Sequence, residues 1–247
     1  RGRLGPAQRA GRGVGGRLAT RRLGEGLAYD HGAALFEPAT RRFAGEVRAW
    51  QEKGLVAPID REATRFRVRS PATALPKRLA RGLHVRLGSR VSRVSSGTGV
   101  LRAEIHEGGV LEASALLLTA PVPQCLDVLA AGALLPVLPP GLLEGLRSVR
   151  YRPAFVLLLR LAVRVAGLPP GGVFLPRDGG CVSRLIENAG EGPSRLSVCA
   201  RESWAAERFE ATPRDVAAAL AEAAAGAIGF DPADVLERDL KRWRYAR

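Results

Sequence analysis

The stretch "GRGVGGRLATRR", residues 11–22, contains glycines whose spacing could hold a phosphate. Gly11, Gly13 and Gly16 have the spacing of the GxGxxG fingerprint, the loop that binds a dinucleotide pyrophosphate. That loop works when a buried strand delivers the glycines to the N-terminus of a helix. Upstream, "RGRLGPAQRA" has no apolar run of four residues, and downstream, "RLATRRLGEGLAYD" has no helical stripe. We therefore reject these three glycines as a first dinucleotide fingerprint.

Two adjacent glycines in the same stretch predict a phosphate contact of a different design. Gly15 and Gly16 would let the backbone pass close to a bulky anion, and Arg17 follows them directly. A forked guanidinium at this position can neutralise a pyrophosphate. The alternative is that Arg17 is one more arginine in an arginine-rich chain.

The residues "DHG" at 30–32 place a carboxylate, an imidazole and a flexible residue next to one another. This combination is unusual in a core strand and is suited to the edge of a polar ring system. Two simpler interpretations stay open: Asp30 could cap a turn, and His31 could be a solvated loop histidine.

Helices with clear start and stop signals must position these residues. "ATRRFAGEVRAWQEKG" predicts an amphipathic helix that begins after Thr40 and ends at Gly54. "TPRDVAAALAEAAAGAIG" predicts a helix capped by Thr212 and stopped by Gly229. "DPADVLERDL" repeats the same kind of helix start at Asp231.

Strand patterns alternate with these helices. "LHVRLGSRVSRVSS" alternates as one strand, and "GVLRAEIHEGGVLEAS" predicts a hairpin that turns at 107–109. "ALLLTAP", residues 115–121, is a short apolar run typical of a buried parallel strand, and a helix around "PQCLDVLAA" follows it. "AFVLLLRLAV" and "RLSVCARESW" predict further strands. Strands of both kinds mixed with helices indicate an α/β or α+β architecture.

Several of these segments together resemble the renalase-like flavoproteins, relatives of the FAD-dependent amine oxidases. From about Gly13 onward they occur in the family's order: "GGRLATRR", "DHGAALF", "ALPKRLARGLHV" followed by "RVSRV", "LLLTAPVPQ", "ARESW" and "KRWRYA". The resemblance implies FAD as the cofactor. It also implies an α/β fold with an α+β second domain, in which an incomplete Rossmann-like FAD-binding domain accompanies a substrate domain with a mixed or antiparallel sheet and helices.

The resemblance implies a discontinuous domain organisation. Residues 13–33 and 72–130 would form the partial FAD-binding domain, and residues 34–71 and 131–240 the substrate domain. Residues 1–12 would be disordered or a misread start. The family's first βαβ unit and its closing C-terminal segment have no counterpart here, so we expect a chain truncated at both ends.

The resemblance also implies site residues, without assigning a catalytic acid or base. They would lie against the FAD pyrophosphate (Gly15, Gly16, Arg17), near the isoalloxazine (Asp30, His31, Gly32, Ala33), at the adenine side (Val91), along the cofactor edge (Thr119, Ala120, Pro121), and at the flavin or substrate pocket (Trp204, Tyr245). In such families the protein mainly positions and tunes the flavin. Trp204 and Trp243 are equally suited to be core anchors.

Composition limits the partners of the chain. The net charge is +14, but lysine occurs only at 53, 77 and 241, and the many arginines accompany Ala, Gly, Leu and Val, a bias typical of a GC-rich genome. With only 5% aromatic residues, this argues against nucleic acid as a partner. Cys125, Cys181 and Cys199 have no CxxC or zinc-finger spacing, so we expect buried thiols and no metal. These thiols suit a reducing compartment, and we expect a cytoplasmic location. No apolar run reaches about 18 residues, so we expect no membrane span.

The leading functional hypothesis is an FAD-dependent oxidoreductase. It would oxidise a reduced pyridine nucleotide of the NAD(P)H type, or a related small molecule, with flavin as hydride acceptor and oxygen as reoxidant. One alternative is an amine oxidase, the neighbouring activity of the same superfamily. The other is a non-catalytic remnant or basic nucleic-acid-binding protein, which would bind duplex DNA in a strongly salt-dependent way.

Overall fold

The computed structural model describes residues 7–8, 13–23, 26–69, 71–168, 172–177, 179–188 and 192–246. The chain divides into two compact units. Unit 1 consists of Arg1–Val14 and Ala80–Arg150, and unit 2 consists of Gly15–Leu79 and Tyr151–Arg247. The division into FAD-binding and substrate domains stays a prediction.

The largest element of unit 2 is a five-stranded sheet whose pairings are all antiparallel. Its strands follow the order β12 (Val173–Phe174), β13 (Val182–Glu187), β14 (Arg195–Ala200), β11 (Ala154–Leu161) and β15 (Val235–Trp243). The predicted strand at "AFVLLLRLAV" is confirmed as β11. The strand predicted at "RLSVCARESW" is confirmed only over its first six residues, as β14, because "ESW" begins the short helix α5 (Glu202–Glu207).

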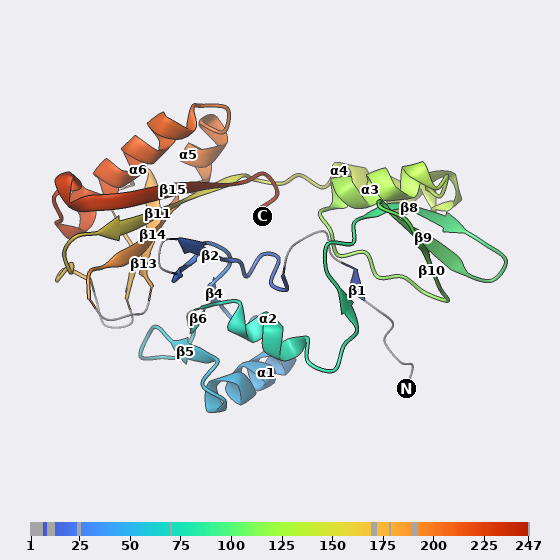
Figure 1. Cartoon of the computed structure of the whole chain (residues 1–247), viewed down its shortest axis with the longest axis horizontal. Helices are drawn as coiled ribbons and strands as arrows, with labels where there is room; N and C mark the ends of the chain where they lie inside the picture. The colour runs from blue at the N-terminus through green and yellow to red at the C-terminus, as the bar shows by residue number, and fades with distance from the viewer. Residues whose placement is uncertain are drawn as a thin grey trace. The chain divides into compact units, whose positions relative to one another are not determined.

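Helix α6 (Pro213–Ile228) packs on one face of this sheet, as Figure 1 shows. Thr212 Oγ1 accepts a hydrogen bond from the Asp215 N–H at 3.2 Å, and Gly229 ends the helix in the left-handed conformation with φ 71°. The predicted helix and both of its ends are therefore confirmed. Its buried residues pack against the odd-numbered residues of β11 to form the main core.

The other face of the sheet packs against a hairpin made by β2 (Thr20–Leu23) and β3 (Leu27–Asp30). Val156 and Leu158 of β11 contact the fully buried Tyr29 of the hairpin. Strand β11 is thus covered on both faces, which explains why its sequence is continuously apolar rather than alternating.

A smaller three-stranded sheet, β4 (Leu35–Phe36), β6 (Phe66–Val68) and β5 (Val56–Pro58), completes unit 2 together with α1 (Arg41–Glu52) and α2 (Ala74–Leu79). Thr40 Oγ1 accepts from the Phe43 N–H at 3.2 Å, and Gly54 has φ 67°. The helix predicted from these two residues is confirmed as α1.

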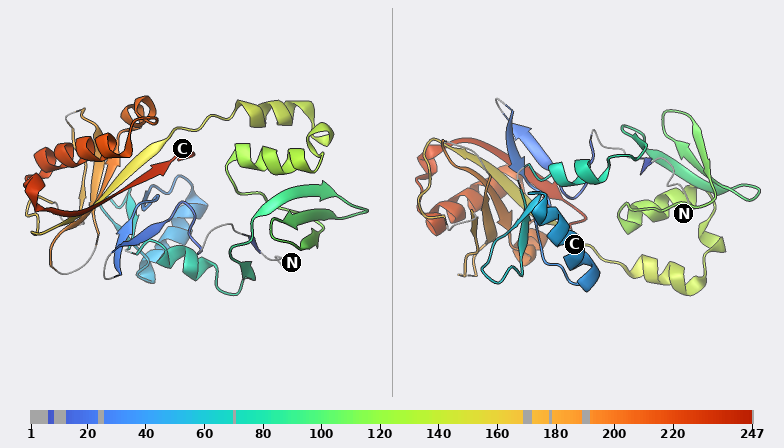
Figure 2. Two further views of the ribbon diagram at one scale, coloured as in Figure 1. Left: turned by 45° about the horizontal axis from the view of Figure 1, so that its top comes forward. Right: turned by 90° about the horizontal axis from the view of Figure 1, so that it is seen from below.

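Unit 1 is built on an antiparallel meander of β8 (Val91–Ser96), β9 (Leu101–Ile105) and β10 (Val110–Ala113), seen with its helices in Figure 2. The predicted hairpin turn between β9 and β10 is confirmed, with Gly108 and Gly109 both at positive φ. Helix α3 (Val122–Ala131) packs on β8. The unit also contains η1 (Leu135–Val137), α4 (Pro140–Ser148) and a short parallel pair of β1 (Ala7–Gln8) with β7 (Val85–Arg86).

Two strand predictions in unit 1 are wrong. "LHVRLGSRVSRVSS" forms two strands, β7 and β8, because Gly88 takes a φ of 66° between them and breaks the extended chain. "ALLLTAP" forms no strand, and Leu117 is 89% exposed. A buried parallel strand needs neighbouring strands for its backbone groups, and the described part of the chain supplies none next to residues 115–121.

The second helix start at Asp231 leads only to a single 3-10 turn, η2 (Pro232–Asp234). Asp231 caps this turn by accepting from the Ala233 N–H at 2.8 Å, but the chain then enters β15. Strand β15 pairs with β11 along its length, and its burial alternates as in a strand. Sheet pairing therefore overrides the local helix-start signal.

The fold class is confirmed as a mixture of helices with antiparallel sheets. Among the described strands only β1 and β7 pair in parallel, and the Rossmann-like part of the prediction is not tested by this arrangement. None of the three cysteines forms a disulfide with another. Cys199 is buried as expected, whereas Cys125 and Cys181 are partly exposed, because neither lies in the middle of a strand covered on both faces. In the described part of the chain no helix combines the length and apolar character needed to cross a membrane.

Candidate functional site

Gly15 and Gly16 form a tight turn directly before Arg17. The Leu18 N–H donates to the Gly15 carbonyl at 2.8 Å, and the two glycines have φ values of 138° and 50°. A Cβ on Gly15 would lie only 3.0 Å from the Leu18 carbonyl oxygen. Both positions therefore favour glycine for conformational reasons.

The segment after this turn lies against residues 31–33. The Ala33 N–H donates to the Arg17 carbonyl at 2.6 Å, and the His31 N–H donates to the Ala19 carbonyl at 3.1 Å. A Cβ on Gly32 would lie 2.0 Å from the Arg17 carbonyl oxygen, so the two backbones can cross here only because residue 32 is glycine. The structure thus brings two predicted segments side by side: residues 15–17, expected at the pyrophosphate (the phosphate segment), and residues 30–33, expected at the isoalloxazine (the ring segment).

Asp30 is almost fully buried at the end of β3 and has a structural role. Its Oδ1 accepts from Thr20 Oγ1 at 2.6 Å and from the Ala72 N–H at 2.8 Å. Its own N–H donates to Asn188 Oδ1 at 2.8 Å. Among the described residues Oδ2 has no hydrogen-bond partner. Asp30 therefore holds the β2–β3 hairpin in place next to the site.

A cavity of about 320 Å³ lies within unit 2, between these loops and the five-stranded sheet. Four predicted site residues line it from the loop side: Arg17, His31, Gly32 and Ala33. The sheet side is formed by the starts or ends of β11, β13, β14 and β15, with residues such as Ser183, Arg184, Cys199, Arg201 and Trp243. The volume is at the lower end of the range for small-molecule sites.

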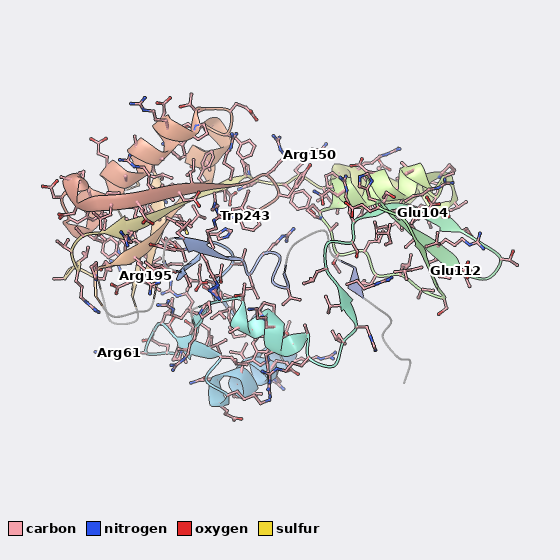
Figure 3. All side chains as sticks on the ribbon, viewed as in Figure 1. Arg61, Glu104, Glu112, Arg150, Arg195 and Trp243 are labelled. Carbon is pink, nitrogen blue, oxygen red and sulfur yellow. The ribbon has the colours of Figure 1, made fainter. Side chains whose placement is uncertain are left out.

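His31 and Trp243 form an aromatic pair in this cavity. Their ring centroids are 5.4 Å apart, and Trp243 Nε1 donates to the His31 carbonyl at 3.1 Å. Figure 3 shows Trp243 between the sheet and the β2–β3 hairpin. Burial, with a smaller effect of the Lys241 charge, lowers the pKa of His31 to about 4. The imidazole is therefore neutral near pH 7.

Four arginines line the cavity: Arg17, Arg152, Arg184 and Arg201. Among the described residues Glu202 is the single acidic one that lines the cavity, and it forms an ion pair with Arg152. The cavity is accordingly cationic. Of these four, the sequence marks Arg17 alone, through the two glycines before it, because in a chain so rich in arginine no composition signal marks the other three.

The remaining predicted site residues do not line this cavity. Val91, at the start of β8, and Thr119, Ala120 and Pro121, just before α3, belong to unit 1. Trp204 packs instead against the core at Phe155, with a ring-centroid distance of 6.3 Å, as the core-anchor interpretation expected. Tyr245 contacts Tyr151 at 5.2 Å, and the Arg17 guanidinium lies 6.0 Å from the Tyr151 ring. Tyr245 is thus near the cavity without lining it.

The residues around the cavity fit a flavin. Its donor set combines the Arg17 guanidinium beside the glycine turn, a neutral imidazole and an indole ring, which suit an anionic molecule with a planar aromatic ring. No three His, Cys, Asp or Glu residues in the described ranges lie close enough together to hold a metal ion.

Comparison with known families and structures identifies similar proteins. The family model described as "Flavin containing amine oxidoreductase" matches residues 51–247. A putative protoporphyrinogen oxidase from Exiguobacterium sp. 255-15 is similar with a TM-score of 0.55 and 15% identity, over 81% of this chain and 44% of that one. Cyclohexylamine oxidase from Brevibacterium oxydans IH-35A has a TM-score of 0.57 and 15% identity, over 73% of this chain and 40% of that one.

A third structure, putrescine oxidase bound to putrescine, has a TM-score of 0.54 and 15% identity over 72% of this chain and 39% of that one. At this identity the three structures show a shared fold. The present chain spans less than half the length of each of them.

Proposed function

The chain belongs to the flavin-containing amine oxidoreductase family, and from this premise we propose that it acts as an FAD-dependent oxidoreductase on a small molecule. Membership of the family implies FAD as the cofactor. The substrate that we propose is a reduced pyridine nucleotide or a related compound. The renalase-like subgroup, resembled through "GGRLATRR" and "DHGAALF", is part of the same proposal.

The observation that carries the proposal is that Arg17, which follows the Gly15–Gly16 turn, and residues 31–33 line one cavity. The Ala33 N–H to Arg17 carbonyl bond joins the two segments. Arg17 could neutralise the cofactor pyrophosphate while residues 31–33 face its ring. Val91, Thr119, Ala120 and Pro121 stay proposed cofactor contacts, as the resemblance implies.

The residues of this chain would bind, orient and tune the reacting groups. When bound, FAD supplies the redox chemistry by accepting a hydride from the substrate and passing the electrons to dioxygen, which leaves as hydrogen peroxide. His31 is neutral near pH 7, so it adds no charge beside the ring. Trp243 holds the His31 carbonyl and offers an aromatic surface to the cavity.

Amine oxidation is the neighbouring possibility, because the structures with a similar fold include putrescine oxidase and cyclohexylamine oxidase. A protonated amine would have to approach four arginines and one glutamate that is already paired. Like charges repel in a site of low dielectric. The lining therefore supports the nucleotide over the amine.

The proposal is tested by reconstitution with FAD. The 247-residue chain, and a version extended by the coding sequence that flanks it, are incubated with FAD, desalted and treated anaerobically with NADH, NADPH or putrescine. We expect retained flavin whose visible absorbance is bleached by a reduced nucleotide and restored by air. Flavin that is retained but bleached only by putrescine would favour the amine oxidase, and failure of both versions to retain FAD would refute the proposal.

A further inference from the structure

A register shift between strands β13 and β14 lets Arg184 line the cavity. Strands β13 and β14 pair Val182 with Ala200 and Arg184 with Cys199, so Ser183 is an extra residue on β13. Neighbouring residues of a regular strand point to opposite faces, yet Ser183 and Arg184 both line the cavity. A β-bulge has this effect, and bulges are common beside binding sites.

Hydrogen bonds hold the bulge in place. Ser183 Oγ lies 3.1 Å from the Cys199 carbonyl oxygen and 3.0 Å from that of Ala200, and donates to this pair of acceptors on β14. The hydroxyl of Ser183 is thereby occupied within the sheet. The group that the bulge makes available to a ligand is the guanidinium of Arg184.

Among the described residues, Arg184 has no ion-pair partner and its Nε has no acceptor, unlike those of a structural arginine. Its Nε is buried and has no hydrogen-bond partner among the described residues, and no carboxylate in that part of the chain lies within 4.0 Å of its guanidinium. Leaving a buried donor of a charged group unpaired is costly, unless a ligand supplies the acceptor.

Arg201 is a second guanidinium fixed at the same cavity. Its Nε donates to the Gly180 carbonyl at 2.7 Å, and its backbone N–H donates to the Cys181 carbonyl at 2.6 Å. These bonds attach Arg201 to the segment that leads into β13, just before the bulge. The charge of Arg201 is therefore held in the cavity without the entropy cost of ordering a free side chain on binding.

We infer that Arg184, supported by Arg201, forms a binding site for an anionic group of the substrate, a phosphate or a carboxylate. The inference rests on the proposed function, because the cavity must receive the substrate. It narrows the substrate class: small molecules with an anionic group bind, and simple amines, which lack one, do not. A guanidinium is well suited to this role because its donors match two oxygens of a phosphate or carboxylate.

Calorimetric titration of the full chain without flavin tests this site directly. The probes are NADH, inorganic pyrophosphate, putrescine and FAD. Arg184→Gln removes the charge, Arg184→Lys keeps it without the fork, and Arg214→Gln removes an equal charge from an exposed position on α6, outside the cavity. Circular dichroism and melting curves establish that each variant is folded.

We expect Arg184→Gln to weaken NADH and pyrophosphate binding by roughly tenfold or more. Arg184→Lys should recover part of this loss, Arg214→Gln should stay within about twofold of the parent protein, and putrescine should not bind. FAD affinity should be the same in all variants.

Three results would overturn the inference. One is unchanged NADH affinity in Arg184→Gln, and another is a parent chain that binds neither NADH nor pyrophosphate. The third is an equal loss of FAD affinity, which would assign the anion to the cofactor. Because these titrations need no flavin, binding of NADH through Arg184 without any bleaching of bound flavin would refute the proposed function and leave the anion site standing.

Discussion

The side-chain oxygen of Asn188 accepts a hydrogen bond of 2.8 Å from the backbone N–H of Asp30, although 158 residues separate them. The Asn188 Nδ2 donates to Ser197 Oγ at 3.0 Å and to the Arg195 carbonyl at 3.3 Å. Asp30, Asn188 and Ser197 are all buried. Because His31 follows Asp30 directly, this contact fixes the start of the ring segment relative to the sheet.

We expect Asn188→Ala to lower the free energy of unfolding by about 1–3 kcal/mol, because it leaves the buried Asp30 N–H without its acceptor. Urea denaturation measures the change. Ser92→Ala is the matched control, since it removes an exposed hydrogen bond of 3.3 Å to the Glu104 carbonyl and should cost little. Equal losses in the two variants would contradict the role given to Asn188.

Gly32→Ala should lower the free energy of unfolding by about 1–3 kcal/mol and weaken FAD binding, because the new Cβ would meet the Arg17 backbone. Gly13→Ala is the control from the same glycine-rich region, where a Cβ would have nothing within 4 Å. It should change stability by less than about 0.5 kcal/mol. Denaturation and flavin titration of both variants check this, and a tolerant Gly32 would show that the close backbone crossing is wrong.

Stability should depend on pH through His31. The pKa of its imidazole is lowered to about 4 mainly by burial; Lys241 and Arg21 lower it further, while Asp239 and Asp30 oppose them. The unfolded chain therefore holds this proton more tightly, and the His31 contribution to stability is complete above pH 6.5 and is lost as the pH falls toward 4.

The measurement is the free energy of unfolding of the parent protein and of His31→Gln between pH 4.5 and 7.5. On acidification the stability of the parent should fall more steeply than that of His31→Gln, because only the parent contains the buried imidazole with the lowered pKa. Carboxylates elsewhere contribute equally to both proteins. Parallel curves would mean that the pKa of His31 is not depressed. A histidine proton resonance that titrates near 6.5 and is missing in His31→Gln would mean the same.

The local signals in the sequence predicted helices well, and long-range pairing limited the rest. Thr40 and Thr212 cap their helices in the structure because a cap depends only on nearby backbone groups. The strand predicted at "ALLLTAP" does not form, because an apolar run does not reveal whether a partner strand exists. The 3-10 turn after Asp231 gives way to β15 because β11 supplies a pairing partner.

In the candidate site, too, local sequence motifs predict one part and long-range strand pairing determines the other. The loop side, Arg17 with residues 31–33, could be predicted because family-like motifs mark it. The sheet side could not be predicted, because the direction of the Arg184 side chain depends on a register shift between β13 and β14. The alternation of residue types along a strand does not show such a shift. The sequence does not distinguish Trp243 from Trp204, and only the fold shows that Trp243 faces the cavity while Trp204 packs against the core.

The visible spectrum of FAD-reconstituted protein during anaerobic titration with NADH tests the proposed activity and the anion site together. We expect bound flavin that NADH bleaches, that air restores, and whose bleaching needs much more NADH in Arg184→Gln than in Arg214→Gln. Bound flavin that stays fully oxidised with NADH and NADPH, or a protein that never retains FAD, would contradict the proposed activity.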